Sequence, residues 1–73
     1  MDESLERLLE EMIGAQRARL AALASRLAPG ATAEDLLQPH DHPVLSRNPD
    51  FNFEDGMLAG YLAVRAALRA KPR

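Results

Sequence analysis

The segment His40-Asp41-His42 is the one stretch of the sequence in which neighbouring side chains could bind a metal or transfer protons. Imidazole nitrogens suit divalent transition metals, and a carboxylate can complete or orient such a site. Ligands this close together in a loop still need further donors, and a turn between Pro39 and Pro43 explains these residues without a metal. A metal site at His40, Asp41 and His42 is therefore our alternative hypothesis, and no cofactor is expected.

The adjacent carboxylates Glu54 and Asp55 are the closest match in the sequence to a catalytic acid–base pair. Neighbouring residues on a helix point about 100° apart, so the two are better explained as first-turn acids facing the positive end of a helix dipole. The Ser residues lack the flanking residues of a nucleophile motif, and no phosphate-binding glycine loop is present. We therefore expect no catalytic activity.

Three basic residues, Arg65, Arg69 and Arg73, share one helix face at spacing i, i+4, i+8. Such a stripe could bind phosphate groups. No aromatic residues are interleaved with it for base stacking, the net charge is −2, and cations are favourable near a helix C-terminus. We therefore expect no nucleic-acid partner.

The segment NPDFNFED, residues 48–55, concentrates polar side chains around two aromatic rings. Aromatic residues in such a turn often form a core plug, but the polar side chains exceed what helix initiation requires. If the chain has a partner-binding surface, we expect it here. Its predicted residues are Asn48, Asp50, Phe51, Phe53, Glu54 and Asp55.

Composition favours a small helical domain. Hydrophobic residues make up 47% and charged residues 27% of the 73 residues, which is typical of a globular chain. Ala and Leu dominate, whereas Val and Ile together number three, which favours helix over sheet. We predict one all-α domain over residues 1–73: an antiparallel helical hairpin of two long helices joined by an ordered, partly helical linker. The predicted helices cover about 3–28, about 33–37 in the linker, and about 53–70.

Capping residues suggest where these helices begin and end. Pro29-Gly30 stops the first helix, and Thr32-Ala-Glu-Asp35 resembles a capping box for the short one. The last helix has two candidate N-caps: Asn48, which Pro49 follows, and Asn52. A turn at 48–51 before a main helix satisfies both. We expect the linker to pack back on the first helix through Leu36, Leu37, Val44, Leu45, Phe51 and Phe53.

A coiled-coil-like seam runs along the first helix at 4-3-4-3-4 spacing. Its members are Leu9, Ile13, Gln16, Leu20, Leu23 and Leu27. The polar member, Gln16, is either buried, where it would fix register or oligomeric state, or lies at a solvated rim, which is the simpler interpretation. We predict that this seam pairs copies of the chain into a homodimer or tetramer.

The two long helices are expected to pair with each other through small residues. Gly14, Ala18, Ala21 and Ser25 repeat the spacing of Gly56, Gly60, Ala63 and Ala67, and such stripes allow close backbone approach. Both helices begin acidic and end basic, so an antiparallel pair places opposite charges together.

A domain of this size buries a small core and commonly needs support from disulfides, metals or partner chains. With no Cys in the chain, self-association is the expected support. No apolar run reaches the ~20 residues of a membrane span, and the acidic start differs from a secretory signal, so we expect a cytoplasmic protein with no membrane partner. The predicted function is that of a homo-oligomeric, protein-binding adaptor or regulator; the alternative is a metal- or small-ligand-binding domain that uses the histidine loop and the 48–55 turn.

Overall fold

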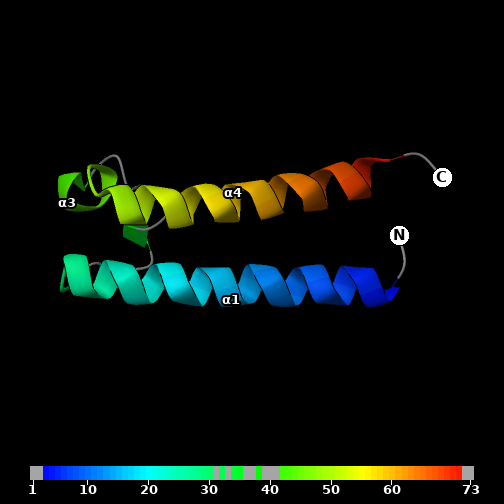
Figure 1. The fold of residues 1–73 in the computed structure, drawn as a ribbon, viewed down its shortest axis with the longest axis horizontal. Coiled ribbons are helices and arrows are strands. Elements are labelled where there is room, and N and C mark those ends of the chain that lie inside the picture. The colour runs from blue at the N-terminus through cyan, green and yellow to red at the C-terminus, as the bar shows by residue number, and fades with distance from the viewer. Residues whose placement is uncertain (1–2, 31, 33, 36–37, 39–41, 72–73) are drawn as a thin grey trace.

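Two long antiparallel helices make up most of the structure (Figure 1). It is a computed structural model that describes residues 3–30, 32, 34–35, 38 and 42–71. Helix α1 spans Glu3–Leu27, α3 spans Pro43–Ser46 and α4 spans Pro49–Ala70. The start of α1 and the end of α4 lie at one end of the hairpin, the open end, and α3 lies at the other, the closed end. The predicted all-α hairpin is confirmed, and the described residues contain no strand.

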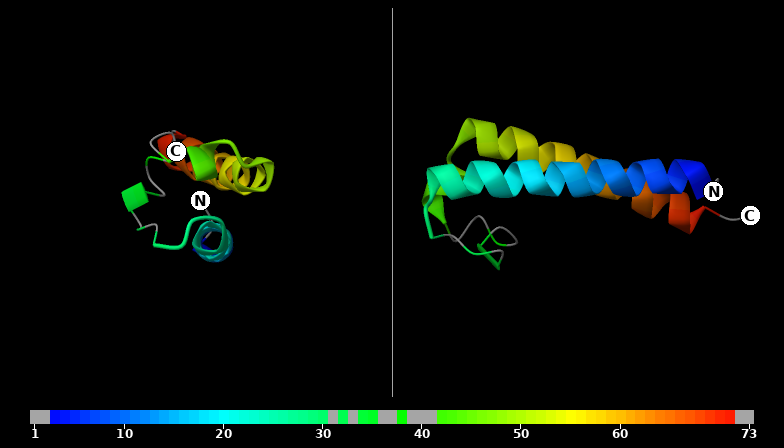
Figure 2. Two further views of the ribbon diagram at one scale, coloured as in Figure 1. Left: turned by 90° about the vertical axis from the view of Figure 1, so that its left-hand side faces the viewer. Right: turned by 90° about the horizontal axis from the view of Figure 1, so that it is seen from below.

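The two helices pack against each other and are inclined to one another rather than strictly parallel, as the views in Figure 2 show. Neither they nor the other described helical residues combine the length and the apolar character that a membrane crossing requires. The hairpin is elongated, with extents of 44 × 20 × 18 Å.

Helix α4 begins at Pro49, about four residues earlier than the predicted start near residue 53. Asn48 is the N-cap: its side-chain oxygen accepts a hydrogen bond of 3.0 Å from the backbone N–H of Phe51, and Pro49 occupies the first helical position. Asn52 lies inside the helix, and its side-chain amide donates to the backbone oxygen of Ser46. The Asn48 alternative was therefore the correct one.

The start of the linker follows the predicted capping chemistry. The backbone N–H of Asp35 donates to the Thr32 hydroxyl, and the backbone N–H of Thr32 donates to the Asp35 carboxylate at 2.8 Å, which is the reciprocal pattern of a capping box. Gly30 follows α1 with φ +94°, a value that favours glycine. The rest of the predicted 33–37 helix, beyond residues 34 and 35, lies outside the described residues.

The core lies between α1 and α4, and at the closed end α3 adds to it. Phe51, Ile13 and Leu45 are the largest fully buried side chains. The buried positions of α1 and of the residue that follows it are Leu9, Ile13, Gln16, Leu20, Ala24 and Ala28. This corrects the second half of the predicted seam, because Leu23 and Leu27 lie at the edge of the core. A strict heptad pattern stays on one face only if the helices supercoil. From Leu20 onward, α1 instead buries every fourth residue, Ala24 and Ala28, against Phe51 and Leu45.

Two of the expected linker anchors do not serve as anchors. Leu45 and Phe51 are fully buried as predicted, but Val44 is 52% and Phe53 65% exposed. A four-residue helix such as α3 has one inward side, which Leu45 occupies. Leu36 and Leu37 lie outside the described residues.

The prediction that small residues bring the two helices together was wrong. All eight positions of the two stripes are exposed, and a Cβ added at Gly14, Gly56 or Gly60 would meet no atom within 4 Å. The large side chains of α1 bury more apolar surface than Gly and Ala can, and the hydrophobic gain scales with that area.

These glycines give a direct test of the packing. We expect Gly14→Ala and Gly60→Ala each to raise the free energy of unfolding by about 0.5–1 kcal/mol, because alanine restricts the unfolded chain and favours helix. Gly30→Ala should lower it by about 1 kcal/mol, because φ is positive there. Urea unfolding followed by circular dichroism measures all three. A loss of stability in Gly60→Ala would contradict the packing described here.

Candidate interaction surface

Gln16 is the one buried polar side chain among the described residues, at 4% exposure. Its amide nitrogen donates to the backbone oxygen of Glu54 at 2.9 Å and also to the Glu54 carboxylate. This contact joins the middle of α1 to α4, so it favours the one longitudinal alignment of the helices in which donor and acceptors meet. The prediction that Gln16 lies at a solvated rim was therefore wrong. Gln16 is buried, and its contact aligns α1 with α4 of the same chain.

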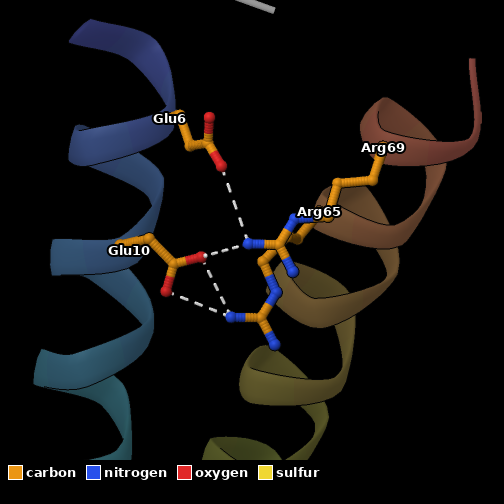
Figure 3. A network of polar contacts seen from close by, with 4 residues as sticks. All are labelled: Glu6, Glu10, Arg65 and Arg69. Carbon is orange, nitrogen blue, oxygen red and sulfur yellow. Dashed lines mark hydrogen bonds and ion pairs between the residues drawn. The ribbon is translucent and has the colours of Figure 1, made fainter. Parts of the chain in front are cut away.

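A charged network joins the helices toward the open end (Figure 3). One nitrogen of Arg65 contacts both carboxylate oxygens of Glu10, at 3.0 and 3.1 Å. Arg69 contacts Glu10 at 3.2 Å and Glu6 at 3.6 Å. The predicted pairing of acidic and basic ends is confirmed here, and it engages two of the three arginines that suggested phosphate binding. Partly exposed pairs of this kind contribute about 0–1 kcal/mol each.

Two of the six residues predicted for a partner surface have structural roles. Asn48 caps α4, and Phe51 is fully buried against α1. The Phe51 ring is therefore unavailable to a partner in this fold. Asp55 is half-buried on α4.

The other three residues of the predicted partner surface line a groove at the closed end. Asp50, Phe53 and Glu54 come from α4, and Arg19, Leu23 and Arg26 come from α1. The groove has a volume of about 300 Å³. Phe53 is the most exposed large apolar residue in the described chain, so this part of the predicted surface is open to a partner.

A second groove of about 330 Å³ lies toward the open end and is almost wholly apolar. Its lining residues are Leu5, Leu8, Leu9, Met12, Tyr61, Val64 and Leu68. Leu5, Leu8 and Val64 are each about half exposed.

Both grooves lie on the same side of the hairpin. Their lining residues on α1 include 5, 8, 12, 19, 23 and 26, and those on α4 include 50, 53, 61, 64 and 68. Each set has helical spacing and forms one stripe, and Met57 falls on the α4 stripe between Phe53 and Tyr61. We call this surface the apolar flank and define it by Leu5, Leu8, Met12, Leu23, Phe53, Met57, Tyr61, Val64 and Leu68. The opposite side is partly covered at the closed end, where Leu45 of α3 packs with Ala24 and Ala28.

Only part of this flank is predicted by the sequence. The broad apolar arc of the last helix indicated a second neighbour, but the stripe Leu5-Leu8-Met12 was not separated from the seam beside it. The signal was present: Leu5 and Leu8 lie outside the 4-3-4-3-4 pattern that begins at Leu9.

The histidine loop is described only in part. His40 and Asp41 lie outside the described residues. His42 precedes α3, where its backbone oxygen accepts bonds from Leu45 and Ser46. Its Nδ1 atom is buried and has no hydrogen-bond partner within the described part of the chain. Among the described residues, no three His, Cys, Asp or Glu side chains are grouped to hold a metal ion. The metal site stays a prediction.

Comparisons of this chain with protein-family models, with curated proteins and with solved structures find no match. The grooves, the apolar flank and the charges around them are therefore the features of this chain that bear on its function.

Replacement of Gln16 tests the buried polar contact. We expect Gln16→Ala to lower the free energy of unfolding by about 1–3 kcal/mol, because it leaves a void and removes the partner of Glu54. Gln16→Leu should stay within about 1 kcal/mol of the parent, since leucine fills similar space and the half-buried Glu54 carboxylate can turn to water. Urea unfolding measures both, and an unchanged Gln16→Ala protein would show that the amide is solvated.

The two phenylalanines should behave in opposite ways. Phe51→Ala should lower the free energy of unfolding by about 3–5 kcal/mol, because it empties the centre of the core. Phe53→Ala should change it by less than about 0.5 kcal/mol, since that ring is mostly exposed. Denaturant melts at low protein concentration make the comparison, and equal losses would contradict the assigned burial.

Proposed function

We propose that this chain is a non-catalytic adaptor or regulator that acts as a homo-oligomer and binds protein through the apolar flank. The observation that carries the proposal is the flank itself. Five of its large side chains, Leu5, Leu8, Met12, Phe53 and Val64, are between 40% and 65% exposed along one side of the hairpin.

Concentrated apolar exposure of this kind is typical of interaction surfaces. Single exposed hydrophobic residues are ordinary, but contiguous patches on small domains mark contacts with other molecules. The need for support is also greatest in chains of this size, because a small fold buries a limited share of its surface. Covering the flank would add buried area to both helices.

The proposed oligomer surface differs from the one predicted from the sequence. The seam of α1 was expected to pair copies of the chain, but α4 covers most of it, and Leu9, Ile13 and Leu20 are buried within the hairpin. We therefore assign self-association to the flank. Phe53 and Asp50, at its closed end, are the residues of the predicted partner surface that this contact would use.

Self-association is tested by mass and by thermal stability. We expect the molar mass from light scattering to exceed that of the 8.0 kDa chain as concentration rises, and the melting temperature to rise with it. Leu8→Glu should weaken assembly at least about tenfold, because it buries an unpaired charge. Ala18→Glu is the matched control, as Ala18 is exposed on another face of α1. A monomeric mass together with a melting temperature independent of concentration would overturn the proposal.

A further inference from the structure

At the closed end of the flank, α1 carries the positive charges and α4 carries the negative ones. The groove there takes Arg19 and Arg26 from α1, and Asp50 and Glu54 from α4. Glu54 is engaged with Gln16. Within the described part of the chain, Arg19, Arg26 and Asp50 make no hydrogen bond or ion pair, in contrast to the arginines of the open-end network. The closed end therefore presents a cationic edge and an anionic edge side by side.

The open end of the flank is different. Its groove is lined by apolar side chains and by Tyr61, with no acidic or basic residue among the described residues of its lining. The flank thus has an apolar half and a half with opposite charges on its two edges. That pattern restricts what can cover it.

Two copies whose helices are aligned can face each other through this flank around a two-fold axis in two ways. If the axis runs across the helices, the closed end of one copy lies over the open end of the other, and Arg19 and Asp50 are set against apolar side chains. If the axis runs along the helices, closed ends meet, and each α1 faces the α4 of the other copy. Opposite charges then meet, whereas the first arrangement desolvates charges without partners.

We infer that a second copy of this chain covers the apolar flank around a two-fold axis parallel to the helices, with Arg19 and Arg26 of each copy facing Asp50 of the other. This inference rests on the proposed self-association and specifies its geometry. The result is a four-helix bundle in which every long helix contacts two neighbours. In it the apolar halves of the two flanks also lie against each other.

The size of the flank suits this pairing. The molecule measures 44 × 20 Å along its two longest axes, which limits one face to roughly 900 Å² in projection, enough to hold the roughly 800 Å² that each partner buries in a standard interface. The two-fold axis makes the interface isologous, so one surface suffices for both copies and the assembly closes as a dimer.

Charge reversal on separate chains tests the geometry. One variant carries Arg19→Glu and Arg26→Glu, and the other carries Asp50→Arg. The inferred dimer has two symmetry-related contacts between residues 19 and 26 of one copy and residue 50 of the other. In a dimer of either variant with itself, like charges meet at both contacts. In the dimer of one variant with the other, opposite charges meet at both. We expect each variant alone to self-associate about tenfold or more weakly than the parent. Native mass spectrometry of the mixture should show the heterodimer well above the statistical one half.

A third chain that carries all three substitutions is the matched control. It restores opposite charges across the inferred interface, so it should self-associate within about threefold of the parent. Circular dichroism melts confirm that every variant is folded, and Ala18→Glu controls for added charge elsewhere on α1.

The outcomes separate the geometry from the proposed function. If the two variants form dimers but the heterodimer makes up only the statistical one half of their mixture, α1 does not face α4 of the other copy. The proposed self-association would still stand. A parent chain that is monomeric at every concentration overturns both, and the flank then belongs to a different protein. Heterodimer enrichment with recovery in the triple variant supports the inferred bundle.

Discussion

Two packed helices share a single interface, so each can bury only one side of itself. In this chain the shared side is filled by Ile13, Leu20 and Phe51, with Leu45 closing one end. The remaining large apolar side chains of both helices therefore lie outside the core, and most gather on the apolar flank. Hydrophobic gain is proportional to the area removed from water, so covering the flank would stabilise the chain further. A second copy can supply that cover.

Polar contacts align the two helices rather than supply most of their stability. The Gln16–Glu54 contact crosses the middle of the interface, and Glu10 with Arg65 and Arg69 crosses it near the open end. Partly exposed ion pairs contribute little, but a helix shifted along its neighbour would lose all of these contacts together and would leave the amide of Gln16 buried without a partner. Alignment in turn decides which side chains form the flank.

Local chemistry was predictable where a few neighbouring residues decide it. The capping box at Thr32–Asp35, the glycine after α1 and the Asn48-Pro49 cap all appear in the structure, because each depends on bonds within a few residues. Choosing Asn48 over Asn52 was harder, since both side chains can cap, and only the structure shows that Asn48 accepts from the backbone N–H of Phe51 while Asn52 lies inside the helix. The candidate surface was predicted in part: Phe53 and Asp50 are exposed as expected, but Phe51 is core.

The sequence by itself determined that the chain is helical, that Pro29-Gly30 ends the first helix and that the charges favour an antiparallel pair, because propensity, helix termination and helix dipoles act over a few residues. Only the tertiary structure decided which stripe of α1 meets α4. Three stripes were available: the seam, the small residues and Leu5-Leu8-Met12, all with helical spacing. The choice depends on how much area each stripe buries against one particular neighbour, a property of two surfaces together that periodicity within one helix does not contain.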